Sequence, residues 1–447
     1  MRGPASTSAR PRQGAWCAVA GLLLVALAPA APLADDAAVS DSATDSYAAD
    51  VRRCPRPADP RRDHMECRLN WFDATLETLT EFWAGARNDM GKIGVVPRAS
   101  VYGSFFASAG LPGGGTLLGG TLSLSLTLDM GKLAGARGLS FYVGGLGALS
   151  KEPWPFPVSV NYVKSGAWLT ELYVQQALFD GRLTLTAGRL QPAMSFAFLP
   201  VMLNYLSNLA YTGWLAFDEP PYPPQFRSQW GAQAAWTVDP EWQVAAGLFN
   251  NNPYAAAGAA HGFDWQFQEG NVGVLVMAQG AWLPGARKGS GALPGMYGLG
   301  GWYDGNRFAD LGTGATSKGS YGLYAMAQQM VLRQGDPGSG RGLTAWALFT
   351  WTPRVNVNLT PIGLEGGASW HGFAEARPRD TVSLAAYAGR YSPALPGDHK
   401  ILGLEATYDL SLTRAISVIA DFQGIFGVNG VPGVNAFVAG LQLGLTL

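Results

Sequence analysis

The chain has 447 residues, with 31 basic against 32 acidic side chains, so its near-neutral balance gives no indication of a nucleic-acid partner. Charged residues make up only 14% of the chain, which is too few to cover the surface of an ordinary water-soluble domain. Beyond the N-terminal region no run of about 18 apolar residues occurs, which argues against membrane-spanning helices. A glycine- and aromatic-rich chain of this kind is typical of strands with one face toward lipid and one toward water.

The N-terminal region has the plan of a secretory signal peptide. Basic residues precede an apolar stretch, residues 15–31, that ends in small side chains. We therefore expect residues 1–34 to be a signal peptide, with cleavage after Ala30 or Ala34.

Residues 35–67 are rich in Ala, Ser, Asp, Arg and Pro without periodicity, which predicts a flexible linker. Export would leave Cys54 and Cys67 in an oxidising compartment, where a disulfide closing a small loop is the favoured interpretation and two free thiols the alternative. With three Cys and four His in all, no metal site and no cofactor are expected.

Residues 68–95 are expected to hold a short amphipathic helix on the periplasmic side. Apolar residues recur there at three- and four-residue spacing: Leu69, Phe72, Leu76, Leu79 and Trp83. Such a helix would either pack against a barrel rim or plug its mouth.

Strict alternation predicts strands along the rest of the chain, residues 96–447. In Thr121–Asp129, four leucines share one face, and hydroxyl groups and a carboxylate share the other. Repetition of this pattern predicts an all-β fold, an antiparallel transmembrane barrel of sixteen strands. The expected strands are 98–108, 118–130, 138–150, 168–178, 182–190, 230–238, 242–249, 272–282, 295–304, 320–333, 342–352, 363–375, 382–392, 400–410, 416–426 and 434–447.

Two local features fix the orientation of these strands. Asp180 and Gly181 lie between two alternating runs, which is a strong hairpin signal and is assigned to the periplasmic side. On either side of this turn, parity places Glu171, Tyr173 and Arg182 on the face toward the lumen. Arg189 would point outward by strict alternation, unless a bulge at Gly188 turns it inward.

The segment 191–229 is the longest predicted loop and is unusually apolar. Aromatic side chains such as Phe196 and Trp214 are costly to leave in water, so we expect the loop to fold into the lumen and narrow it. Aromatic faces beside Asp218 and Arg227 suit sugars, whose C–H faces stack while their hydroxyls hydrogen-bond. The alternative is that the aromatic residues only pack the loop against the inner wall.

At these motifs the chain resembles a known family. Its most specific segments are Leu169–Gln176, Phe179–Leu183, Ala187–Leu190 and Ser195–Phe196. From Trp83 to the C-terminus the chain resembles the carbohydrate-selective porins of the OprB type, although it ends in Leu447 where an aromatic residue is common. The resemblance implies a sixteen-stranded barrel that admits glucose and other sugars by diffusion, and it points to Glu171 and Arg189 as pore residues.

The expected function is passive, sugar-preferring diffusion of small hydrophilic solutes across a bacterial outer membrane, with a general or non-sugar channel as the alternative. An outer-membrane hydrolase is disfavoured because no His lies in a recognisable nucleophile motif. A structural anchor is disfavoured because the segment before the barrel is too short for a binding domain. Expected partners are small sugars, outer-membrane lipid, lipopolysaccharide and the barrel-assembly machinery, for a monomer or a homotrimer.

Overall fold

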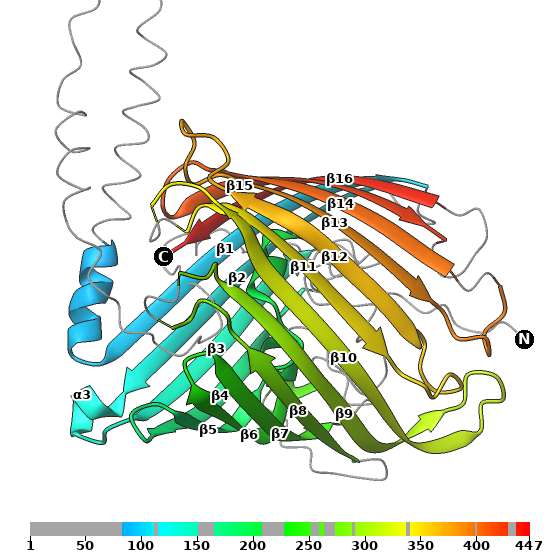
Figure 1. The fold of residues 1–447 in the computed structure, drawn as a ribbon, viewed down its shortest axis with the longest axis horizontal. Coiled ribbons are helices and arrows are strands. Elements are labelled where there is room, and N and C mark those ends of the chain that lie inside the picture. The colour runs from blue at the N-terminus through cyan, green and yellow to red at the C-terminus, as the bar shows by residue number, and fades with distance from the viewer. Residues whose placement is uncertain are drawn as a thin grey trace, which may run out of the picture.

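The fold is a closed barrel of sixteen antiparallel strands, in which each strand pairs with its neighbours in the sequence and β1 pairs with β16 (Figure 1). The computed structural model describes residues 83–110, 115–150, 165–207, 228–251, 259–262, 273–287, 291–336, 340–397, 400–427 and 435–447. The strands are β1 (Val95–Ala109), β2 (Thr116–Asp129), β3 (Leu139–Ser150), β4 (Gly166–Leu178), β5 (Leu183–Leu190), β6 (Gln229–Asp239), β7 (Trp242–Asn251), β8 (Gly273–Trp282), β9 (Gly295–Ala309), β10 (Thr316–Arg333), β11 (Gly342–Trp351), β12 (Ile362–His371), β13 (Thr381–Arg390), β14 (Lys400–Ser411), β15 (Ile416–Phe426) and β16 (Asn435–Thr446).

The predicted number and order of strands are confirmed, and most strand ends agree within three residues. Three strands differ more. β10 begins at Thr316, four residues before the expected start at residue 320, because its first residues pair with the end of β9. β12 ends at His371 rather than at residue 375, because Gly372 takes a left-handed φ of 62° and begins a turn. β9 continues to Ala309, five residues beyond the expected end, because its ladder with β10 continues past a register shift near Gly319.

The last residues of the chain close the barrel. Leu447 N–H donates to Ala99 O at 2.8 Å, and Ala99 N–H donates to Leu447 O at 3.1 Å. Leu447 also packs beside Ala99 and Leu124. The closing seam between the first and last strands is therefore paired down to its final residue, which leaves no sheet edge there.

Alternation along each strand separates a lipid face from a lumen face, as the sequence predicts. In β16, Leu441 and Leu443 are more than half exposed on the outside, whereas Gln442 between them is 2% exposed. In β2, Thr121, Ser123 and Ser125 are buried on the inside, between the leucines. In these strands the inner face is therefore polar and the outer face apolar.

One end of the barrel carries short turns and, in barrels of this class, such an end faces the periplasm. The predicted turn at Asp180–Gly181 is present: both residues have positive φ, and Arg182 N–H donates to Phe179 O at 3.2 Å. This geometry matches the hairpin turn that Asp-Gly favours. Near the same end, aromatic side chains on the outer face stack in a row: Trp242 with Trp282, and Trp282 with Tyr297. They form part of an interfacial aromatic belt.

A helix over residues 83–92, α1, lies at this end near the C-terminus (Figure 1). It lies within the segment 68–95 and ends at residue 92, because Gly94 has a φ of 95° and β1 begins at Val95. Lys132, in the short helix α3 (Met130–Ala134) between β2 and β3, donates through Nζ to Gly91 O at 2.8 Å. The helix is thus fastened to the rim of the barrel. Within the described ranges, no helix has the length and apolar character needed to cross a membrane.

Candidate functional site: a loop folded into the barrel

The segment after β5 packs against the inner wall of the barrel. Its described part, residues 191–207, is called the lumen loop here. Two 3₁₀ turns shape it, Pro192–Met194 and Pro200–Asn204, each with proline at its first position, where the missing N–H is tolerated. Between them Ala197 has a φ of 54°, which bends the chain. Trp214, Asp218 and Arg227, predicted to contact solute, lie outside the described residues, as do Cys54 and Cys67.

Apolar side chains of the lumen loop pack against the inner wall. Phe196 is 1% exposed and meets Phe249 of β7 edge to face, with ring centroids 6.1 Å apart. Tyr205 packs against Trp346 of β11, with ring centroids 5.6 Å apart. The shared cluster contains Phe196, Ala197, Leu199, Val201, Met202 and Tyr205 from the loop, and Leu190, Phe249, Leu275, Met277, Trp302, Tyr324, Met326, Trp346, Leu348 and Ala385 from the strands. The aromatic side chain of Phe196 therefore fixes the loop to the wall.

Backbone groups of the lumen loop are satisfied by polar side chains of the wall. Ala197 N–H donates to Gln279 Oε1 at 2.9 Å, and Val201 N–H donates to Gln328 Oε1, also at 2.9 Å. Gln279 Oε1 accepts a further bond from the Tyr324 hydroxyl at 3.0 Å. Irregular backbone is tolerated inside a barrel when its donors find such partners.

The far end of the lumen loop is bonded to strands β11 to β14. Asn204 Nδ2 donates to Ser369 Oγ at 2.7 Å, and Thr407 Oγ1 donates to Asn204 O at 2.8 Å. Trp346 Nε1 donates to the Tyr205 hydroxyl at 3.0 Å, which in turn lies 2.9 Å from Leu384 O. The loop thus begins at β5 and reaches the wall at β14, far around the ring.

At the start of the loop the structure brings together two of the predicted residues, Glu171 and Tyr173. Glu171 is hydrogen-bonded to Gln191, the first residue of the lumen loop. Tyr173 stacks on Tyr142 of β3, with ring centroids 4.8 Å apart and an angle of 13° between the rings. The sequence reasoning missed Tyr142, although Phe141 and Val143 on either side are exposed outward and alternation could have placed it inside.

The other two predicted wall residues are placed differently. Arg182 lies at the short-turn end, where its guanidinium donates to Thr237 O at 3.3 Å and to Val238 O. Arg189 pairs with Leu172 in the β4–β5 ladder, which has no register shift. The bulge at Gly188 that could have turned Arg189 inward is therefore not formed. Gly188 instead has a φ of 141°, and a Cβ there would lie 2.7 Å from Tyr173 Cα.

Two carboxylates outside the strands order the ends of the barrel. At the short-turn end, burial alone would raise the pKa of Asp380, but hydrogen bonds from Arg377 and Tyr408 outweigh burial and lower it. At the opposite end, the hydrogen bond from Asn356, followed by that from Thr313 N–H, lowers the pKa of Asp310 to about 2. Each carboxylate therefore hydrogen-bonds two neighbouring strand connections to each other.

A closed sixteen-strand barrel with an apolar exterior and a loop folded inside defines an outer-membrane porin, a channel and not an enzyme. Residues 73–447 match the family described as "Carbohydrate-selective porin, OprB family", and the chain belongs to this family.

Two protein sequences and two solved structures illustrate the relationship. The chain is 29% identical to Porin B of Pseudomonas aeruginosa over 234 residues, which is 48% of this chain and about half, 49%, of that protein. It is 24% identical to the putative porin QuiX of Acinetobacter baylyi over 434 residues, 85% of this chain and 95% of that protein. The high-pH structure of Pseudomonas putida OprB aligns with a TM-score of 0.71 at 20% identity, covering 82% of this chain and 97% of that one. The low-pH structure of that protein aligns with a TM-score of 0.52 at 18% identity. At these identities the two structures establish the fold alone.

Proposed function

We propose that the chain forms a channel through which small sugars diffuse passively, with a preference over other solutes of equal size. The observation that supports this most directly is the lumen loop, which packs against the wall from β7 to β14 and so narrows the lumen on that side. Solute would then pass along the remaining wall, where Tyr142 and Tyr173 stack beside Glu171. Membership of a carbohydrate-selective porin family supports the same solute class.

The chemistry of this wall suits neutral polar solutes. A tyrosine edge or face can contact the C–H groups of a sugar, while the phenol hydroxyl and the Glu171 carboxylate accept or donate hydrogen bonds to its hydroxyls. Arg98 of β1 lies on the neighbouring wall opposite Ser125, which is bonded to Tyr142. In this proposal Glu171 and Tyr173 contact solute, together with Trp214, Asp218 and Arg227. Phe196 holds the loop and Arg182 holds the turn, and Arg189, which pairs with the outward-facing Leu172, is placed on the outer face.

Liposome swelling with the purified protein tests the proposal. Glucose, a disaccharide, a neutral amino acid of similar size and a small salt are compared, and glucose is expected to enter faster than its size predicts. Tyr173→Ala should reduce that preference, whereas Tyr321→Ala, which removes an outward-facing tyrosine of β10, should leave it unchanged. Equal entry of glucose and the amino acid would show a general channel, and absence of swelling would refute a pore.

The same proposal places outer-membrane lipid and lipopolysaccharide around the apolar exterior, and the barrel-assembly machinery in its biogenesis. The protein would act as a monomer or a homotrimer. Cross-linking in native membranes distinguishes these two states, since only a homotrimer gives a ladder that ends at three copies.

A further inference from the structure

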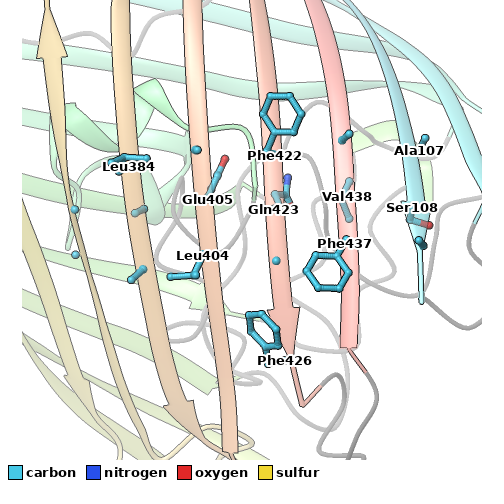
Figure 2. A pocket seen from close by; sticks show the side chains of 18 of the residues that line it. Ala107, Ser108, Leu384, Leu404, Glu405, Phe422, Gln423, Phe426, Phe437 and Val438 are labelled. Carbon is cyan, nitrogen blue, oxygen red and sulfur yellow. The ribbon is translucent and has the colours of Figure 1, made fainter.

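A single buried carboxylate holds the last described residues of the lumen loop. Glu405 of β14 is 2% exposed and faces the interior, while its neighbour Leu404 faces outward; both are labelled in Figure 2. Its Oε1 accepts the backbone N–H groups of Leu206 at 2.8 Å and of Ser207 at 2.9 Å. Its Oε2 accepts the Ser207 hydroxyl at 2.5 Å. Three donors from two consecutive loop residues therefore converge on one side chain.

The carboxylate of Glu405 is bonded to the loop and not to a cation. Among the described residues the ion pairs are Lys92–Asp89, Arg287–Asp239 and Arg377–Asp380, and none includes Glu405. The described residues also hold no group of three acidic, His or Cys side chains that could bind a metal ion. Two N–H groups and the hydroxyl of the loop satisfy this buried group, which also lies beside the Asp421 carboxyl group of β15. Removing Glu405 would leave the two buried N–H donors without an acceptor.

The contact between Glu405 and the loop lies almost opposite the strand from which the loop starts. The lumen loop leaves the wall at β5, and β14 lies nine strands away in one direction and seven in the other. The loop is therefore held at two nearly opposite parts of the wall, by Gln191 with Glu171 at one end and by Ser207 with Glu405 at the other. The place at which Leu206 and Ser207 are fixed therefore determines how far the loop extends across the lumen.

We propose that Glu405 is a positioning residue that fixes the far end of the lumen loop and thereby sets the width and steadiness of the constriction. The inference rests on the proposed function only in treating the chain as an open pore; it does not depend on which solute passes. Glu405 acts through the loop and does not itself contact solute.

Single-channel conductance in potassium chloride tests this without any sugar. Glu405→Ala should raise the mean conductance and the open-channel noise, because the loop end is released from the wall. Glu405→Gln keeps an oxygen acceptor of the same reach, so its channels should resemble the wild type. Glu405→Asp keeps a carboxyl group but is one methylene shorter, so it should behave like Glu405→Ala.

The matched control is Asp409→Ala, which removes another inward-facing carboxylate four residues further along β14, bonded to Ser417 and not to the loop. It should leave mean conductance and noise near the wild-type values. Folding of every variant is verified by the heat-dependent shift of the barrel in gel electrophoresis. If folded Glu405→Ala channels match both the wild type and Asp409→Ala, the inference is overturned.

A second experiment, with sugars, distinguishes a failure of this inference from a failure of the proposed function. In swelling assays Glu405→Ala should bring the rates of a monosaccharide and a disaccharide closer together than in the wild type. If the wild type shows no preference for sugars over size-matched solutes, the proposed function fails while the conductance result still decides the role of Glu405. If the wild type prefers sugars and the variant keeps wild-type conductance, the inference fails and the function stands.

Discussion

Replacing Tyr205 by phenylalanine removes one hydroxyl group from the centre of the contact between the lumen loop and the wall. The ring would keep its packing against Trp346, but the indole Nε1–H, which now donates to the hydroxyl at 3.0 Å, would lose its acceptor. Tyr205 is 0% exposed, so water cannot easily take the place of the hydroxyl. An orphaned buried donor costs about 1–3 kcal/mol, and we expect the free energy of unfolding to fall by that amount.

Urea unfolding of the protein refolded into lipid vesicles, followed by tryptophan fluorescence, measures this change. Tyr321→Phe is the matched control, because that hydroxyl lies on the exposed outer face of β10 and its loss should change stability by less than about 0.5 kcal/mol. If both variants lose the same free energy, the hydrogen bonds of Tyr205 do not stabilise the loop and the reasoning is wrong.

Two other substitutions have defined outcomes. Asp380→Asn should lower the free energy of unfolding by about 1.5–3 kcal/mol near neutral pH, because it loses charged hydrogen bonds from Arg377 and Tyr408. The pKa of Asp380 is lowered in the folded protein, so the difference in unfolding free energy between Asp380→Asn and the wild type should be full above the ordinary carboxyl pKa of about 4. It should shrink as the pH falls through the folded-state pKa, and urea titrations at several pH values measure this. Gly188→Ala should reduce the yield of folded barrel in heat-shift gels, because the φ of 141° is strained for alanine and the added Cβ would collide with Tyr173. Gly181→Ala is the control: Gly181 also has a positive φ but has open space around it, so this change tests the backbone strain alone.

Much of the wall could be predicted from the sequence because each strand separates two solvents. Lipid outside and water inside impose a period of two on every strand, so a run such as Thr121–Asp129 shows both its conformation and its orientation. The Asp180–Gly181 turn then set the direction of the count. The apolar character of the lumen loop predicted its place inside the barrel, because its side chains needed a wall to cover them.

The contacts of the site could be predicted far less well, because they join residues from distant parts of the chain. Alternation along β14 is enough to place Glu405 on the inner face, but it gives no means of pairing Glu405 with Ser207. The stacking of Tyr142 on Tyr173 depends on the register of β3 and β4, which shifts at a bulge near Gly144. Phe196 could be read as a solute contact or as packing, and only the position of Phe249 distinguishes these roles.

The bond between Ser207 and Glu405 spans 198 residues of chain, and this separation orders events in time. The wall can form strand by strand between neighbours, whereas the loop end has no acceptor until β14 has joined the ring. Contacts between such distant residues are slow to form, because a long chain must be closed first. The first part of the loop can pack on β7 to β11 earlier, but its far end is fixed only near completion, so the constriction takes its final shape late in assembly.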